Sequence, residues 1–281
     1  MSREIPDFLE SELSPRPAEQ CLFHVIPAPL EETVSYGGGT RNGPEAILRA
    51  STQLEAFDEG LCACERGIHT AAAAGDPDAV RRTAAKALRC GAVPVLLGGE
   101  HSATLAPLKA LRDEGVSFGL VQFDAHADLR DCYEGRRDSH ACVMRRAIED
   151  LDLPLFQIGV RAMSPGEHEL RRERAIPHLD AESIAAGGVP APLLPATFPG
   201  HVYITFDVDA LDPSLMPATG TPEPGGLDWW TARRLIRAVT AGRRVVGIDV
   251  VELAPIPGMH APDFTAARLT YALITAAADN A

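Results

Sequence analysis

The sequence of 281 residues has little positive charge, no long hydrophobic run and few cysteines, and each shortage excludes a class of protein. Lys and Arg number 26 against 39 Asp and Glu, so the formal net charge is −13. A surface this acidic repels nucleic-acid phosphates and attracts a cationic small molecule. No apolar run approaches the ~20 residues that span a bilayer, and the first residues lack the apolar centre of a signal peptide. We therefore expect a cytoplasmic protein with neither nucleic-acid nor membrane partners.

Two motifs that would indicate particular binding sites are absent from the sequence. The six cysteines include one close pair, Cys62-Ala-Cys64, but no second pair lies nearby to complete a zinc site. In the cytoplasm such cysteines are reduced thiols. The segment Tyr36-Gly-Gly-Gly-Thr-Arg-Asn-Gly-Pro44 lacks the Gly-Lys-Ser/Thr ending of a phosphate loop. We therefore expect neither a cysteine zinc site nor a nucleotide site.

Apolar runs of strand length recur along the chain and alternate with helical patterns. Several runs are continuous, which is typical of strands buried on both faces of a parallel sheet. They cover residues 21–26, 93–97, 118–123, 154–158, 202–206 and 245–250. The helical patterns cover residues 76–89, 102–114, 139–150, 228–241 and 264–278. This alternation predicts an α/β three-layer fold, with one domain over residues 21–281 and a loose polar arm over residues 1–20.

Polar side chains follow three of the predicted strands, where ligands of open parallel sheets bind. They are His101, the alternating set Asp124, His126 and Asp128, and the alternating pair Asp207 and Asp209. Alternate residues at a strand end share one side and can converge on one point. Taken alone, the histidine is also typical of a structural turn, and the acidic segments are also typical of solvated turns. Because the preceding strands are apolar, we favour a buried cluster, which needs a cation.

Together the three strand ends supply two imidazoles and four carboxylates. This set is too large for one tetrahedral zinc site. It suits two oxygen-preferring ions such as Mn²⁺ that share bridging carboxylates. A two-metal site lowers the pKa of a bridging water and yields hydroxide near neutral pH. The residues alone therefore predict a hydrolase.

The three segments resemble the signature motifs of the ureohydrolase family, which comprises arginases, agmatinases and their relatives. The resemblance runs from about residue 25 to about residue 275, and the segment Thr33–Ile47 resembles the corresponding segment of bacterial and archaeal agmatinases. Thr205 stands where the family usually has Ser. The resemblance implies a three-layer α/β/α fold with a mainly parallel eight-stranded sheet, two Mn²⁺ ions per subunit, and assembly into trimers or hexamers.

The resemblance also implies roles for individual residues. The more buried ion would take His101, Asp124, Asp128 and Asp207. The second ion would take Asp124, His126, Asp207 and Asp209. The bridging hydroxide would attack the guanidinium carbon, and Asp209 would also orient it. His140 matches the histidine that protonates the leaving amine, and Glu252 matches the glutamate that pairs with the substrate guanidinium.

The substrate tail should bind the loop between Asp128 and His140. This loop contains no asparagine, whereas arginases use asparagine and serine here to hold the α-amino acid group, so arginine is disfavoured. A cationic tail could bind Asp131, Glu134 and Asp138, a carboxylate tail could bind Arg136 and Arg137, and all five could instead form a solvated loop. The agmatinase-like segment favours agmatine, cleaved to urea and putrescine in polyamine biosynthesis. The alternatives are N1-aminopropylagmatine and then a guanidino acid such as guanidinobutyrate.

Two other functional classes stay open. A single-zinc amide deacetylase on the same broad fold would not need Asp209 or Glu252, and both are present. A noncatalytic binding protein that kept the fold would be expected to have lost a metal ligand or His140, and none is missing.

Overall fold

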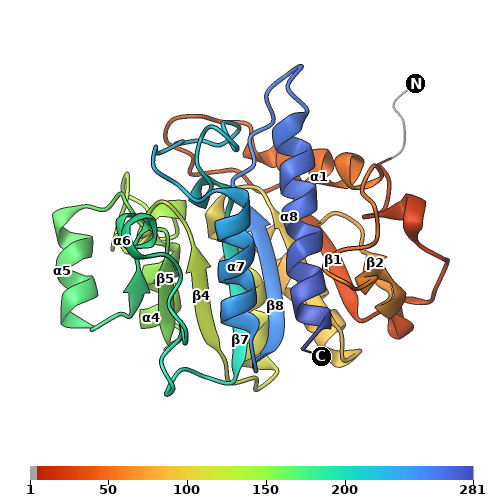
Figure 1. Ribbon diagram of the computed structural model, residues 1–281, viewed down its shortest axis with the longest axis horizontal. Helices are drawn as coiled ribbons and strands as arrows, with labels where there is room; N and C mark the ends of the chain where they lie inside the picture. Colours follow the sequence, from red (N-terminus) through yellow and green to blue (C-terminus); the bar gives the residue numbers. More distant parts are fainter. Residues whose placement is uncertain (1–4, 281) are drawn as a thin grey trace.

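Eight parallel strands form one sheet between two layers of helices (Figure 1). The computed structural model describes residues 5–280. The strand order is β2-β1-β3-β8-β7-β4-β5-β6, and each neighbouring pair is parallel. The strands are β1 (Phe23–Ala28), β2 (Ile68–Thr70), β3 (Val93–Gly98), β4 (Gly119–Phe123), β5 (Leu155–Ile158), β6 (His178–Leu179), β7 (His201–Asp207) and β8 (Arg244–Val251). The predicted three-layer fold with a parallel eight-stranded sheet is thereby confirmed.

The helices form the crossovers that parallel neighbours require. α1, α7 and α8 pack on one face of the sheet, and α2, α3 and α4 pack on the other (Figure 1). The helices are α1 (Gly43–Ser51), α2 (Pro77–Arg89), α3 (Leu105–Asp113), α4 (Val143–Glu149), α5 (Pro165–Glu173), α6 (Ala181–Gly187), α7 (Trp229–Thr240) and α8 (Ala261–Ala278). Over residues 5–280, none of these helices combines the length and the apolar character needed to span a membrane. With helices on both faces, the central strands β1, β3, β4 and β7 are almost wholly buried, which explains their continuous apolar runs.

The six predicted strands are present, but the two edge strands and several helices were not predicted. β2 and β6 have only three and two residues, too few to produce a hydrophobic period. α5 is mainly charged and buries only one apolar side chain, Leu170. The predicted helices 102–114 and 139–150 begin as short 3₁₀ turns, over His101–Thr104 and His140–Cys142.

The N-terminal segment differs from the loose arm expected for residues 1–20. Residues 1–4 lie outside the described residues, but Phe8 and Leu9 are fully buried in the core. The backbone N–H of Phe8 donates to Thr70 Oγ1 at 2.9 Å, and that of Leu9 donates to Ser51 Oγ at 2.9 Å. The expectation of a loose arm is therefore wrong for this part of the chain, because two apolar residues anchor an otherwise polar segment.

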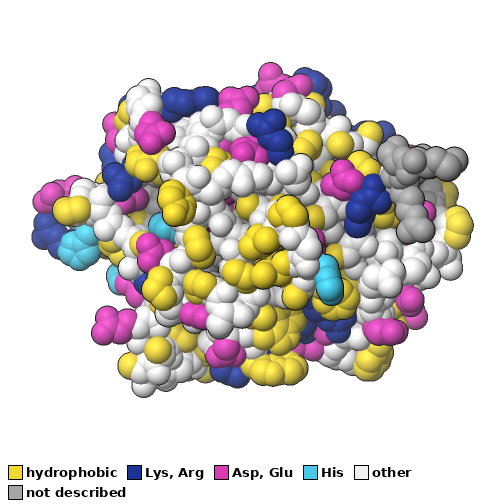
Figure 2. All heavy atoms as spheres, turned by 90° about the horizontal axis from the view of Figure 1, so that it is seen from above, with side chains coloured by type: hydrophobic (Ala, Val, Ile, Leu, Met, Phe, Trp, Pro, Cys, Tyr) yellow, Lys and Arg dark blue, Asp and Glu magenta, His cyan; other side chains and the backbone are white. Residues whose placement is uncertain are grey.

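The strand order places the predicted site in the middle of the sheet. β3, β8, β7 and β4 are consecutive neighbours in space, although they are far apart in the sequence. Their carboxyl ends point to the same edge, where the long loops gather at the top of Figure 1. Figure 2 looks down on this edge and shows acidic, basic and hydrophobic side chains mixed over it. Residues that follow these four strands are thereby brought to one place.

Candidate metal centre

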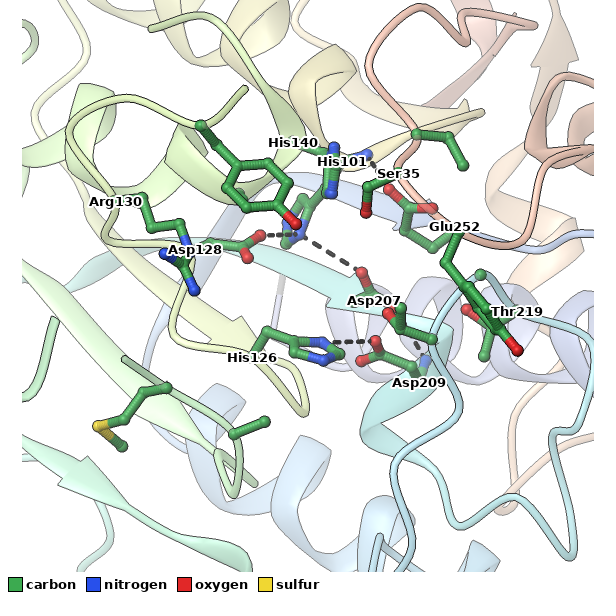
Figure 3. A pocket seen from close by; sticks show the side chains of 18 of the residues that line it. Ser35, His101, His126, Asp128, Arg130, His140, Asp207, Asp209, Thr219 and Glu252 are labelled. Atoms are coloured by element: carbon green, nitrogen blue, oxygen red, sulfur yellow. Dashed lines mark hydrogen bonds and ion pairs between the residues drawn. The ribbon is translucent and has the colours of Figure 1, made fainter. Parts of the chain in front are cut away.

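The four central strands bring the predicted metal ligands around one cavity, and all of them except Asp124 line it (Figure 3). His101 follows β3, Asp207 and Asp209 lie at the end of β7, and Asp124, His126 and Asp128 follow β4. Glu252, the predicted partner of the substrate, follows β8. Gly99 lets the chain turn before His101, because a Cβ at this position would collide with the carbonyl oxygen of Leu30.

His101 is oriented by a chain of buried hydrogen bonds. The Thr205 hydroxyl donates to Asp249 Oδ1 at 2.6 Å, so its oxygen accepts a hydrogen bond from His101 Nε2–H at 2.9 Å. Tyr203 donates to the other oxygen of Asp249 at 2.8 Å. Because Nε2 carries the hydrogen, the unprotonated nitrogen of the neutral ring is Nδ1.

His101 Nδ1 points at three carboxylates. It lies 3.1 Å from Asp124 Oδ2, 3.0 Å from Asp128 Oδ2 and 3.5 Å from Asp207 Oδ2, yet it makes no hydrogen bond of good geometry. A nitrogen lone pair that faces three anionic oxygens in a buried place is repulsive unless a cation lies between them. The arrangement of His101 and these carboxylates therefore fits a metal ion.

A second group of ligands shares Asp124 with the first. His126 Nδ1 lies 2.9 Å from Asp209 Oδ2 and 3.6 Å from Asp124 Oδ1. Asp124, His126 and Asp209 could hold a second ion, as His101, Asp124 and Asp128 could hold the first. A mixture of imidazole and carboxylate donors suits ions such as Mn²⁺, whereas thiolate donors suit softer ions.

Backbone N–H groups fix the carboxylates in place. Ala125 N–H donates to Asp209 Oδ1, Asp209 N–H donates to Asp207 Oδ1, and His126 N–H donates to Asp124 Oδ1. In Asp207 and Asp209 the opposite oxygen is the one that approaches an imidazole nitrogen, whereas Asp124 approaches His101 through Oδ2 and His126 through Oδ1. The backbone after β7 thus presets which oxygens of Asp207 and Asp209 face the cluster.

The pKa shifts show how strongly the cluster needs positive charge. Burial, together with the nearby carboxylates Asp209, Asp124 and Glu252, raises the pKa of Asp207 well above its ordinary value. Burial and then Asp124 raise the pKa of Asp128 to about 7. Burial lowers the pKa of His101, but Asp124 and Asp128 outweigh it and hold that pKa well above its ordinary value. The raised pKa values favour the protonated forms of these groups, which lessens the repulsion between the buried carboxylates.

Glu252 and Asp128 are held in unusual backbone conformations. Their φ angles are +67° and +53°, in the left-handed region that side chains other than glycine rarely adopt. Glu252 Oε1 accepts a hydrogen bond from His101 N–H at 2.6 Å, which leaves Oε2 without a donor from the described part of the chain. Strained conformations of this kind cluster at functional sites. Both carboxylates line the cavity.

His140 lies on the rim of the same cavity, beside His101 in Figure 3. Its Nδ1 lies 3.1 Å from Thr33 Oγ1, and its ring meets the edge of the Tyr133 ring with centroids 5.8 Å apart. Burial lowers the pKa of His140 below its ordinary value. The ring is therefore poised as a neutral base at pH 7.

The structure places the predicted tail residues outside the cavity lining. The cavity has a volume of about 350 Å³, and its lining includes Arg130, Tyr133 and Glu167 but none of Asp131, Glu134 and Asp138. Arg146 and Arg137 pair with Asp131, and Arg136 pairs with Asp138 at 2.9 Å. This differs from the expectation that the three carboxylates hold an amine tail, because arginines of the loop and of α4 already neutralise two of them.

Sequence reasoning missed three residues that support the site. The sequence around Asp249 assigns it no role, because the apolar run over residues 245–250 offers it no polar partner. In the sheet it lies beside Thr205 in register and orients His101 through that hydroxyl. Thr33 contacts His140 across 107 positions of sequence, and it contacts Glu100 across 67 positions. No local pattern reports contacts at that separation.

Comparisons with known proteins agree with this geometry. The family model described as "Arginase family" matches residues 22–276. The N(1)-aminopropylagmatine ureohydrolase of Synechocystis sp. is 39% identical over 95% of this chain and 92% of its own length. The agmatinase of Pyrococcus horikoshii is 33% identical over 90% of each chain. The crystal structure of the agmatine ureohydrolase of Thermoplasma volcanium superposes with a TM-score of 0.85 at 29% identity, over 98% of this chain and 95% of that one.

Proposed function

Because this chain belongs to the arginase family and is one of its ureohydrolases, we propose that its substrate is N1-aminopropylagmatine. Water would cleave the guanidinium carbon–nitrogen bond to release urea and the free amine. The sequence expectation put agmatine first, but the higher identity to the aminopropylagmatine enzyme than to the agmatinase favours the alternative. Agmatine remains the second candidate, because the agmatinase similarity also covers 90% of the chain.

The observation that carries the catalytic proposal is the pair of ligand groups joined at Asp124. We assign two divalent ions, taken to be Mn²⁺, to these groups. The first ion would take His101, Asp124, Asp128 and Asp207, and the second would take Asp124, His126, Asp207 and Asp209. Bound there, the ions would activate water for attack on the guanidinium carbon and stabilise the negative charge on the attacking oxygen.

Glu252 is the proposed partner of the substrate guanidinium. Burial raises its pKa to about 8, so an approaching cation favours the ionised form and gains a strong, charge-assisted hydrogen bond. Its unused Oε2 is the oxygen available for this bond. The backbone N–H of His101 holds Glu252 beside the proposed metal ligands, so a guanidinium paired with Glu252 would have its reacting carbon next to them.

His140 and Asp209 are the proposed proton-handling residues. A neutral His140 can take a proton at the cavity and return it to the leaving amine, which must be protonated to depart. Asp209 Oδ2 faces His126 at the other side of the cluster and is placed to orient the attacking water. Both assignments follow the family resemblance and are consistent with the lining of one cavity.

The test is urea release by Mn²⁺-loaded protein from N1-aminopropylagmatine, agmatine, arginine and guanidinobutyrate in parallel, with bound manganese counted per chain. The largest kcat/KM for N1-aminopropylagmatine, with two ions per chain, is the expected result. A larger kcat/KM for agmatine would replace the substrate assignment and leave the chemistry in place. A count of one ion per chain, or no urea from any of the four compounds, would overturn the two-metal proposal. The deacetylase and the binding protein would then be the functions to test.

A further inference from the structure

A buried carboxylate, Glu100, holds the contact between the loop after β1 and the rim of the cavity. Its two oxygens accept four hydrogen bonds: from the backbone N–H of Glu32 and Thr33 at 2.9 and 2.6 Å, from the Thr33 hydroxyl at 3.0 Å, and from the Ser102 hydroxyl at 2.5 Å. Accepting without donating is the behaviour of an ionised carboxyl group. Glu100 is only 2% exposed, so solvent does not compete for these bonds.

The Thr33 hydroxyl has one hydrogen, and Glu100 takes it. The oxygen of Thr33 is therefore an acceptor toward His140. It receives the backbone N–H of His140 at 3.0 Å and lies 3.1 Å from His140 Nδ1. The second contact is a hydrogen bond only if Nδ1 carries the hydrogen.

This bond determines which tautomer His140 adopts. With hydrogen on Nδ1, the neutral ring presents a lone pair at Nε2, the nitrogen on the side of the ring away from Thr33. His140 lines the cavity, so that lone pair is available there. The opposite tautomer would set two lone pairs, those of Nδ1 and of the Thr33 oxygen, against each other in a partly buried place.

We infer that Thr33, itself fixed by Glu100, is a positioning residue that holds His140 as the Nδ1–H tautomer with Nε2 toward the substrate. This inference rests on the proton-transfer role proposed above for His140. Thr33 acts through His140 and touches no reacting atom. Ser139 Oγ lies farther from Nδ1, at 3.3 Å, and donates to no carboxylate among residues 5–280, so Ser139 serves as the matched control.

Kinetics separate positioning from a general structural effect. Thr33→Val keeps the shape of the side chain and should lower kcat about 10–100-fold with little change in KM, the range typical when an orienting partner is lost. Thr33→Ser should restore most of kcat, and Ser139→Ala should change it little. In a His140→Ala background, Thr33→Val should have no further effect. An equal loss of kcat with and without His140 would overturn the inference.

A spectroscopic measurement tests the tautomer without relying on turnover. Ring ¹⁵N–¹H correlation spectra of the Mg²⁺-loaded protein, with the His140 signal identified from His140→Ala, should show hydrogen on Nδ1. Thr33→Val should lose this signature while Ser139→Ala keeps it. Hydrogen on Nε2 in the unmodified protein would overturn the inference. Failure of the proposed function would instead give no urea with the Nδ1–H signature intact.

Discussion

Replacing Thr205 by Val tests whether the buried chain from Asp249 orients His101. Val matches the shape of Thr but has no hydroxyl, so His101 Nε2–H and one Asp249 oxygen both lose their partner. Both residues are at most 1% exposed, so water cannot replace the lost bonds. An unsatisfied buried polar group costs about 1–3 kcal/mol, and two of them should lower the free energy of unfolding by about 2–6 kcal/mol.

The melting temperature and the Mn²⁺ affinity of the Thr205→Val variant both measure this loss. In a chain of this length each kcal/mol shifts the melting temperature by about 2 °C, so the metal-free variant should melt about 4–12 °C lower. Loss of a partner that orients a metal ligand lowers metal affinity about 10–100-fold, which corresponds to about 1.4–2.8 kcal/mol of binding free energy. Calorimetric titration with Mn²⁺ measures this affinity in the folded variant.

The matched control is Thr205→Ser, which keeps the hydroxyl in the same place and removes only a methyl group. It should retain Mn²⁺ affinity within a few-fold. A Val variant that is less stable but binds Mn²⁺ as tightly as the unmodified protein would refute the reasoning. Such a result would mean that Asp249 and Thr205 stabilise the fold without orienting His101.

Three further predictions follow from the site and the core. Asp209→Ala should abolish urea release and lower bound manganese to one ion per chain; two ions with normal activity, by elemental analysis and urea assay, would contradict the second ion. Chelating the metal should lower the melting temperature more at about pH 8.5 than at about pH 6. The pKa values of Asp128 and Glu252 are raised to about 7 and about 8, so these groups bind more protons in the folded than in the unfolded chain. The stability of the metal-free protein therefore falls as the pH rises through that window. A loss independent of pH would oppose this. His24 has the opposite sign: burial lowers its pKa, so the unfolded chain binds more protons below about pH 6.5 and stability is lost as pH falls. In urea denaturation, His24→Gln should weaken this dependence, and an unchanged profile would show that His24 does not contribute.

The sequence predicted the central sheet and the ligand residues because both leave local signals. A buried parallel strand is a continuous apolar run, and alternation at a strand end, as in Asp124, His126 and Asp128, places side chains on one side. The structure brings these predicted ligands together within a few ångströms. Their role as ligands stays a proposal that metal counting tests.

The remaining features depend on tertiary contacts that no local pattern reports. The link from Asp249 to His101 needs β7 and β8 in register, so that Thr205 lies beside Asp249. The link from Glu100 to His140 needs the loop after β1 to fold across the cavity. The ion pairs of the tail loop leave no local signal for a similar reason, because Arg146, which pairs with Asp131, lies on α4, beyond the loop itself. The burial of Phe8 and Leu9 could not be predicted, because two apolar residues in a polar segment produce no hydrophobic periodicity.

The left-handed backbone at Asp128 and Glu252 lowers thermal stability at two positions that the proposed activity needs. Each conformation costs of the order of 1–3 kcal/mol in a residue other than glycine, and the surrounding sheet must compensate for both. Glycine or asparagine would relax the backbone at either position and remove a carboxylate from the cluster. Laboratory evolution under heat selection alone would therefore enrich those replacements and yield a more stable, inactive protein. Selection that scores urea release at the same time would keep both carboxylates, so any gain in heat resistance would have to arise elsewhere in the chain.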